Sequence, residues 1–374
     1  MLVRTGDVRP GATPWIVRSG IAAGSQGDTI ARGRCSENGY GTLPLEVKEN
    51  TVPNVPAGGA GDVSALGEFG LIGAVVGRFA VTPDVLLGPG DDAAVVAAPD
   101  SRVVATMDLL VEGRHFRRDW SSAHDVGRKA AAQNLADVVA MGARPTALLV
   151  GLGCPPDLPV DWATGLADGL AEECALVGAT VVGGDVVRSD HVVVAVTALG
   201  DLEGRAPVTR SGAQAGDVLA VAGRLGWSAA GLAVLGRGFR SPRVLVEAHK
   251  VPVPPYAAGP AAAVAGATAM VDVSDGLLQD AGHVATASGV VLEIDTASLE
   301  VGQPLADAAA AFNADPLEWV LRGGEDHALL ATFPAGAALP DGFIAIGRVS
   351  AGEASVLVDG VPATGLGGHD HFRT

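Results

Sequence analysis

The chain has 374 residues, of which 48% are hydrophobic and 18% are charged, and its formal net charge at pH 7 is −17. The length exceeds one ordinary hydrophobic core and predicts two domains, while the apolar content excludes a disordered chain. The negative charge repels polyanions and argues against nucleic acid as a partner. Any bound nucleotide therefore needs divalent cations, backbone N–H groups or a few arginines around its phosphates.

The cysteines and the N-terminal region bear on the compartment. Cys35, Cys154 and Cys174 lack the spacing of a zinc site or a disulfide framework, so we expect reduced thiols. No apolar run reaches about 18 residues, and charged residues from Arg4 to Asp28 interrupt the region where a signal peptide would lie. These features predict a cytoplasmic protein with no membrane partner.

Residues 1–63 are rich in Gly and Pro, lack sustained periodicity and predict a flexible N-terminal extension. A helical apolar spacing begins at Ser64, which we expect to cap the first helix. Residues 64–205 form the predicted first domain. Its further elements are strands at 85–87, 93–97, 103–107, 147–152, 180–182 and 192–199, and helices at 125–141 and 162–177. This order predicts an α/β domain with paired strands.

Residues 206–374 form the predicted second domain, which begins after an Arg-rich turn. Its predicted strands are 218–222, 269–273, 290–294, 327–333 and 344–349, and its predicted helices are 227–235 and 277–287. Both halves therefore belong to the α/β (α+β) class.

Familiar nucleotide-binding motifs are missing. There is no GxxxxGK[ST] segment, and the three lysines are Lys48, Lys129 and Lys250. The HRD and DFG motifs of protein kinases are missing too. The segment 88–93 fits GxGxxA, but a β-like run follows it where a dinucleotide site needs a helix.

Aspartates instead stand beside glycines at the ends of apolar segments. The instances are Gly90-Asp91-Asp92, Met107-Asp108, Asn134 with Asp137, Gly183-Gly184-Asp185, Asp272 to Gly276 and Gly323-Gly324-Glu325-Asp326. Desolvating an unpaired carboxylate costs several kcal/mol, and basic residues are scarce nearby. Because Mg²⁺ prefers hard oxygen ligands together with substrate phosphates, the set indicates a metal–phosphate site. Each motif alone is also explained by a turn aspartate or a helix cap, as for Asp275 before the helix at 277.

Two of these side chains share one helix face. Asn134 and Asp137 are three residues apart and lie on the same face as Ala130 and Met141. That face is mostly apolar, so we expect the polar pair to point into the structure.

The ordered set of motifs resembles the thiamine-monophosphate kinase family from about Ser64 to the C-terminus. The matching segments are Glu68-Phe69 with Leu71-Ile72, Gly90 to Ala93, Asp108 with Leu110 to Phe116, Asn134 with Asp137 and Met141 to Ala143, Gly183 to Asp185, Asp272 to Gly276, Gly323 to Asp326 and Asp370-His371-Phe372.

The resemblance implies a superfamily that includes aminoimidazole ribonucleotide synthetase and selenophosphate synthetase. It implies two α/β domains and a homodimer formed through the N-terminal sheets. It also implies that ATP, as co-substrate, converts thiamine monophosphate to the diphosphate by direct in-line transfer, with several Mg²⁺ ions as cofactors. No covalent nucleophile is expected, since phosphoryl transfer needs positioning and charge neutralisation.

The same resemblance implies roles for individual residues. The implied metal ligands are Asp92, Thr106, Met107, Asp108, Asp137, Asp185, Asp272 and Asp275. The implied ATP contacts are Gly184, Asp185, Arg210 and Ser274, and the implied substrate contacts are His115, Glu325 and His369, with Phe372 nearby. Met107 stands where the family often has Thr, which suits a ligand that uses its main-chain carbonyl. His369 stands where the family usually has an aromatic residue.

Two alternatives stay open on the sequence alone. The first is another ATP-using synthetase of the superfamily, although no cysteine lies near the start of the fold, where selenophosphate synthetases have a reactive one. The second is a non-catalytic protein that binds Mg²⁺ and nucleotide through the same aspartates.

Overall fold

The structure, a computed structural model, describes residues 61–89 and 93–363. All of them belong to one unit, residues 46–374. The predicted extension 1–63 lies almost entirely outside the described residues.

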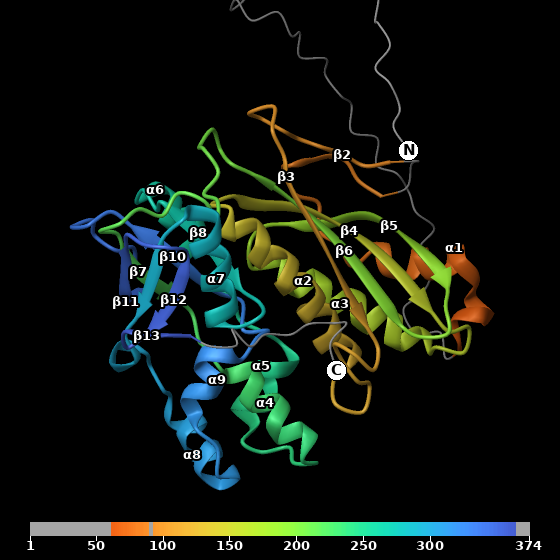
Figure 1. The fold of residues 1–374 in the computed structure, drawn as a ribbon. Helices are drawn as coiled ribbons and strands as arrows, with labels where there is room; N and C mark the ends of the chain where they lie inside the picture. The colour runs from red at the N-terminus through yellow and green to blue at the C-terminus, as the bar shows by residue number, and fades with distance from the viewer. Residues whose placement is uncertain (1–60, 90–92, 364–374) are drawn as a thin grey trace, which may run out of the picture. The chain divides into compact units, whose positions relative to one another are not determined.

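A four-stranded sheet dominates the first half, with the strand order β3-β6-β4-β5. Its strands are β3 (Val104–Val111), β4 (Arg144–Cys154), β5 (Thr180–Arg188) and β6 (Val193–Asp201). The neighbours pair antiparallel except for β4 and β5, which run parallel. Helices α2 (Ala123–Ala140) and α3 (Val160–Ala175) lie under one face of this sheet in Figure 1. Along β6, Val194, Val196 and Ala198 are fully buried while the residues between them are half-buried, so the other face is open.

Helix α2 is held firmly in place. A capping box begins it, in which the Ser122 Oγ accepts from the Asp125 N–H and the Asp125 carboxylate accepts from the Ser122 N–H. A Cβ at Gly127 would lie 2.1 Å from the Leu166 carbonyl oxygen of α3. The missing side chain therefore lets the two helices pack backbone to backbone.

The first helix, α1 (Val63–Val76), differs from the prediction. Asp62 is its N-cap, no side chain makes a cap hydrogen bond, and Gly67 interrupts the helix with φ 72° and ψ 172°. The predicted Ser64 cap is therefore wrong. Strands β1 (Val85–Leu87) and β2 (Val95–Val96) form a small antiparallel pair next in the chain.

The second half contains a seven-stranded sheet with the order β13-β12-β9-β11-β7-β10-β8. Its strands are β7 (Val218–Ala222), β8 (Ala269–Val273), β9 (Val291–Ile294), β10 (Ala328–Phe333), β11 (Phe343–Ser350), β12 (Ser355–Val358) and β13 (Val361–Pro362). Its helices are α4 (Trp227–Gly236), α5 (Arg243–Lys250), α6 (Ala258–Val264), α7 (Leu277–Ser288), α8 (Gln303–Phe312) and α9 (Pro316–Arg322), with a 3₁₀ turn at Thr296–Ser298. The predicted α/β class is confirmed, and β7 and β8 have the predicted bounds.

The sequence pattern did not predict four of the helices, namely α5, α6, α8 and α9. Each has seven to ten residues. Helices this short gain most of their stability from tertiary packing, so local propensity carries a weak signal. None of the helices in the described ranges is long and apolar enough to cross a membrane.

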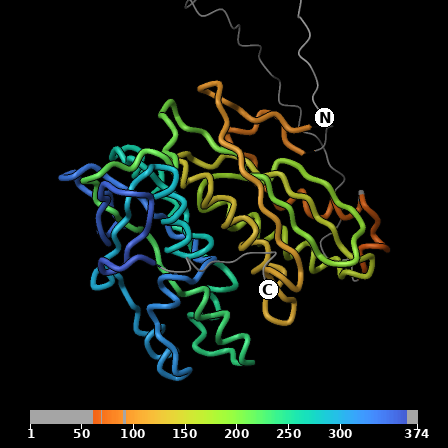
Figure 2. The backbone as a smooth tube through the Cα atoms, in the orientation of Figure 1, coloured from red at the N-terminus to blue at the C-terminus, as the bar shows by residue number. Residues whose placement is uncertain are grey.

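Helix α2 also contacts the second half of the chain. Val139 and Ala140 at its C-terminal end pack in one buried cluster with Met270 of β8 and Phe333 of β10. Figure 2 shows the backbone in the same orientation, with α2 lying between the first sheet and elements of the second half of the chain. Side chains on α2 can therefore meet residues from both sheets.

Candidate active site

The first part of the site joins β3 to α2. The Thr106 hydroxyl donates to the Asp137 carboxylate at 2.7 Å, and the Asn134 Oδ1 accepts from the Asp108 backbone N–H at 3.0 Å. The Gln133 amide donates to the Asp108 carboxylate at 3.1 Å. The expected inward orientation of Asn134 and Asp137 is confirmed, and Asn134 is fully buried.

The second part comes from β8 and the residue before β10. Asp272 at the end of β8 is 3% exposed, and its Oδ2 lies 3.0 Å from Nδ1 of the buried His327. Burial opposes the protonated ring, but the hydrogen bond and charge of Asp272, together with the charge of Asp137, raise the pKa of His327.

These two parts face one another. Burial raises the pKa of Asp137 to about 7, and the negative charges of Asp272 and Asp108 add to the effect. The pKa of Asp108 is also raised, chiefly by burial. Three partly or fully buried carboxylates from both halves of the chain thus repel one another, and a divalent cation would relieve this repulsion.

A sharp turn follows β8 and brings two further motifs together. Gly276 has φ 116°, a conformation that favours glycine, and it occupies the N-cap position of α7. The Glu325 N–H donates to the Ser274 carbonyl at 2.7 Å, and the His327 N–H donates to the Val273 carbonyl at 3.0 Å. Ser274 and Glu325 therefore lie on adjacent backbone segments.

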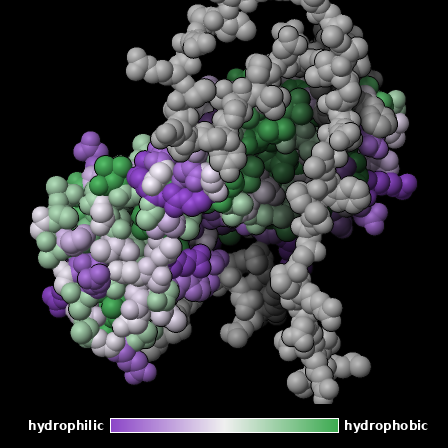
Figure 3. Space-filling view, turned by 90° about the horizontal axis from the view of Figure 1, so that it is seen from above, coloured by the Kyte–Doolittle hydropathy of each residue, from purple (hydrophilic) through white to green (hydrophobic). Residues whose placement is uncertain are grey.

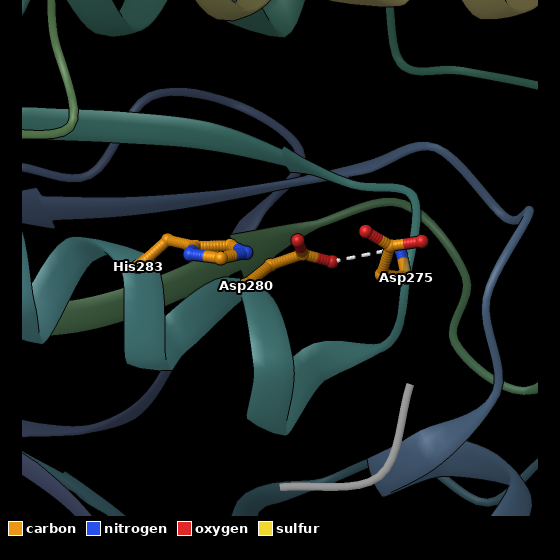
Figure 4. Close-up of side chains that lie close together, drawn as sticks. All are labelled: Asp275, Asp280 and His283. Atoms are coloured by element: carbon orange, nitrogen blue, oxygen red, sulfur yellow. Dashed lines mark hydrogen bonds between the residues drawn. The ribbon is translucent and has the colours of Figure 1, made fainter. Parts of the chain in front are cut away.

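Asp275, Asp280 and His283 form a second group of potential metal ligands. One ligand atom from each lies within 4.8 Å of the others, and Figure 4 shows Asp280 and His283 on α7 and Asp275 in the turn before it. The Asp280 Oδ2 accepts from the N–H groups of Asp275 and Gly276 at 3.0 and 3.1 Å. Asp280 thus binds the turn before α7, and the alternative in which Asp275 caps this helix is wrong. Burial, and then the charge of Asp272, raise the pKa of Asp280 to about 7.

Two of the residues expected to contact the substrate, His115 and Glu325, are both bonded by Lys129 of α2. Nζ of the buried Lys129 lies 3.2 Å from both carboxylate oxygens of Glu325 and 3.2 Å from the His115 carbonyl. Burial favours the neutral acid, but the charges of Lys129 and His249 outweigh it and lower the pKa of Glu325 to about 2. The Val111 N–H donates to Nδ1 of His115 at 3.0 Å, which fixes the ring at the end of β3.

Asp185 lies on the opposite face of the first sheet. Asp185 pairs with Gly151, Gly151 with Ala195 and Ala195 with Leu109, so these residues form one row across the four strands. Leu109 is 49% exposed on the open face, and Asp185 is exposed too. Asp108 is next to Leu109 and faces α2, so within one chain Asp185 and Asp108 point away from each other.

The remaining expected residues have different positions. Gly184 is exposed on β5, Met107 points its side chain to the open face with 56% exposure, and Arg210 is exposed and accepts from Ser288 through its carbonyl. Asp92, His369 and Phe372 lie outside the described residues. The structure thus gathers Thr106, Asp108, Asp137, Asp272, Ser274, Asp275, His115 and Glu325, whereas Met107, Gly184, Asp185 and Arg210 stay predictions.

Several site residues were missed by sequence reasoning. Lys129 and Gln133 precede Asp137 by eight and four residues, so helical spacing on α2 was a usable signal for both. Asp280 and His283 are three residues apart on α7, which is also a helical spacing. His249 and His327 had no local signal, because only tertiary packing brings them to the site.

The fold and the carboxylate cluster define a class of proteins. The profile of "AIR synthase related protein, N-terminal domain" matches residues 90–202, and that of "AIR synthase related protein, C-terminal domain" matches residues 214–360. The chain is an AIR synthase related protein with both domains.

Individual relatives narrow this class. The chain is 53% identical over 308 residues to thiamine-monophosphate kinase of Mycobacterium tuberculosis H37Rv, which covers 82% of this chain and 92% of that protein. It is 35% identical to the Escherichia coli K12 enzyme of the same name over 333 residues, covering 83% and 99% of the two chains. The chain belongs to the thiamine-monophosphate kinase family, as the motif order predicted.

Solved structures agree. The structure of AaThiL complexed with AMPPCP and TMP has a TM-score of 0.69 and 34% identity, and the match covers 82% of this chain and 98% of that chain. A hydrogenase maturation protein HypE, with a TM-score of 0.64, 16% identity and coverage of 80% and 98%, shares the fold alone.

Proposed function

We propose that this protein transfers a phosphoryl group from ATP to thiamine monophosphate and so forms thiamine diphosphate. Family membership supports this reaction, as does the related AaThiL structure, which holds AMPPCP, an ATP analogue, together with TMP. The observation that carries the proposal is the convergence of Asp108, Asp137 and Asp272. Beside them, the backbone at Ser274 is hydrogen-bonded to the backbone at Glu325. Carboxylates for a metal–phosphate centre and a substrate-facing carboxylate thus occupy one region.

Mg²⁺ is the proposed cofactor, held by Asp108, Asp137, Asp272 and Asp275 with help from Thr106. The donor set fits, because all five side chains offer oxygen atoms and the raised pKa of Asp137 reflects a local excess of negative charge. When bound, Mg²⁺ would neutralise charge on the transferring phosphates. Asp92 and the Met107 carbonyl are further proposed ligands. Asp185 is a proposed ligand at the interface with a second copy, because within one chain it faces away from Asp108.

The protein groups around this centre hold it in shape. The Thr106 hydroxyl orients Asp137, and Asn134 and Gln133 fix the backbone and carboxylate of Asp108. The acceptor is already a phosphate, whose oxygen is nucleophilic at neutral pH, so no strong general base is required. Positioning of donor and acceptor is then the main contribution of the chain.

Substrate and nucleotide contacts follow from the same arrangement. We assign the ATP contacts to Gly184, Asp185, Arg210 and Ser274. His115 and Glu325 are assigned to thiamine monophosphate, with His369 or Phe372 completing that site. The Glu325 carboxylate suits an aminopyrimidine donor and the positively charged thiazolium ring.

A homodimer through the open face of the first sheet is the proposed assembly. This face exposes the apolar residues Met107, Leu109, Leu149 and Val187, at 56%, 49%, 39% and 53%. Figure 3 shows a hydrophobic area just right of the centre of the view. A second copy would cover these residues and bring Asp185 into the interface.

The domain boundary at 205/206 and the cytoplasmic location remain proposals from the sequence. The boundary is supported by the profile matches, which end at residue 202 and begin again at 214.

The decisive experiment is phosphate transfer from ATP to thiamine monophosphate by the purified full-length chain, with and without Mg²⁺, followed by chromatography of thiamine diphosphate. We expect Mg²⁺-dependent product from the wild type and none from Asp137→Asn. ATP binding without product would refute this function. It would instead favour another synthetase of the superfamily or a non-catalytic Mg²⁺–nucleotide protein.

A further inference from the structure

Lys129 is a buried lysine in the middle of α2, and its side chain is 3% exposed. Its ammonium group lies 3.2 Å from each carboxylate oxygen of Glu325, 3.2 Å from the His115 carbonyl and 3.4 Å from the His249 carbonyl. An ammonium group has three N–H donors, and here four acceptors surround it. The contact joins residues that are 196 positions apart in the sequence.

Glu325 needs such a partner. The backbone of Glu325 has φ 64°, in the left-handed region that non-glycine residues rarely adopt. This backbone conformation persists only where surrounding contacts hold it. One restraint is the hydrogen bond from the Glu325 N–H to Ser274. The other is the Lys129 ammonium group, which holds both oxygens of the side chain. That side chain is still 36% exposed, so part of it stays accessible to a ligand.

The remaining titratable groups around Glu325 do not replace Lys129 at neutral pH. Burial and the charge of Lys129 lower the pKa of His249 to about 4, so its ring is neutral there. Nδ1 of His249 is 3.4 Å from Glu325 and 3.1 Å from the Ser228 hydroxyl. Because both partners meet the same ring nitrogen, the three residues do not form a proton relay of the Ser-His-acid type. His327 hydrogen-bonds Asp272, and Asp326 accepts from the Gly226 and Ser228 N–H groups.

Lys129 and the metal–phosphate residues share one face of α2. Lys129, Gln133 and Asp137 are spaced by four residues, so they lie along the same stripe of the helix. Eight residues of α-helix span about 12 Å. Helix α2 therefore sets the separation between the Lys129 ammonium group, which pairs with Glu325, and the Asp137 carboxylate, which accepts from Thr106.

We propose that Lys129 is a positioning residue for the acceptor substrate. It fixes the orientation and the negative charge of Glu325, so that this carboxylate can accept a hydrogen bond from the aminopyrimidine of thiamine monophosphate and attract its thiazolium cation. This inference rests on the proposed function, because it needs Glu325 to contact that substrate. It predicts a role in the affinity for thiamine monophosphate and none in the affinity for ATP.

The test compares Lys129→Met, Glu325→Gln and the double variant in steady-state kinetics with both substrates varied. We expect Lys129→Met to raise KM for thiamine monophosphate on the order of tenfold, equivalent to about 1.4 kcal/mol, with little change in kcat or in KM for ATP. Glu325→Gln should give a similar rise. Because Lys129 acts through Glu325, the double variant should be no worse than Glu325→Gln alone. The matched control is Lys250→Met, a partly buried lysine that pairs with Asp125 and Glu247, and it should behave like the wild type.

Several outcomes overturn the proposal. The first is an unchanged KM for thiamine monophosphate in Lys129→Met. The second is a fall in kcat of this variant together with a rise in its KM for ATP, because that pattern indicates a merely structural lysine. Additive losses in the double variant would show that Lys129 does not act through Glu325. If Lys129→Met does not fold, the double variant, which leaves no unpaired charge, is compared with Glu325→Gln: equal KM values support the proposal and a further rise refutes it. A wild type that forms no thiamine diphosphate would instead refute the proposed function.

Discussion

Replacing Asp137 by Asn should abolish phosphoryl transfer and, at the same time, stabilise the metal-free protein. In the absence of metal, burial and the charges of Asp272 and Asp108 raise the pKa of Asp137 from 3.8 to about 7. The unfolded chain ionises this carboxyl near its ordinary value, so the folded state binds the extra proton between about pH 4 and pH 7. Protonated Asp137 therefore leaves the folded state stable at low pH, and the free energy of unfolding falls as the pH rises from about 4 to about 7.

The size of this loss follows from the difference between the pKa of Asp137 in the folded and in the unfolded chain. A difference of about three pH units corresponds to on the order of 4 kcal/mol of unfolding free energy above pH 7. Asparagine carries no charge and can still accept the Thr106 hydrogen bond, so it avoids this loss. We expect Asp137→Asn to be more stable than the wild type by on the order of 4 kcal/mol at pH 8 and by on the order of 1.5 kcal/mol at pH 5, because each pH unit between the two pKa values contributes about 1.4 kcal/mol.

The assay is urea denaturation with EDTA at pH 5 and pH 8, paired with the activity assay in Mg²⁺. Burial also raises the pKa values of Asp280 and Asp326 to about 7, so the comparison between variant and wild type isolates Asp137. The exposed Asp341 provides the matched control, since Asp341→Asn should change neither stability nor activity. Equal stability of Asp137→Asn and wild type in EDTA at pH 8 would refute the crowding of carboxylates that the structure describes.

Three further predictions concern the metal, the helix pair and the dimer. Adding Mg²⁺ to the EDTA-treated wild type should raise Tm in differential scanning calorimetry, because a ligand that binds only the native state stabilises it. The rise in Tm should be smaller for Asp272→Asn. An equal rise in the variant and the wild type would contradict the metal assignment. Gly127→Ala should destabilise the fold by about 1 to 3 kcal/mol in urea denaturation, since its Cβ would lie 2.1 Å from a carbonyl oxygen of α3. The control is Gly236→Ala, where no atom lies within 4 Å, and equal stabilities would argue against the close packing of α2 and α3. Leu109→Glu should lower the mass measured by light scattering toward that of a monomer, because it places a charge on the open sheet face; an unchanged dimer would locate the interface elsewhere.

Much of the architecture was readable from local sequence. The strands β7 and β8 follow from short apolar runs, which are buried almost throughout, and the inward face of Asn134 and Asp137 follows from the helical period of 3.6 residues. The order of the glycine–aspartate motifs was sufficient to indicate the family. Short helices such as α5 and α9 were missed because packing, more than propensity, stabilises them.

The sequence by itself determined the fold class, the family and most of the carboxylates at the site, because each of these depends on residue types at fixed local spacing. Only the tertiary structure decided which carboxylates face one another. Strand register places Asp185 on the open face of the sheet and Asp108 on the face toward α2. Packing of α2 against the second half brings Lys129 to Glu325, and strand β8 brings Asp272 to His327. Contacts between segments this far apart depend on sheet order and helix packing, which no local period encodes.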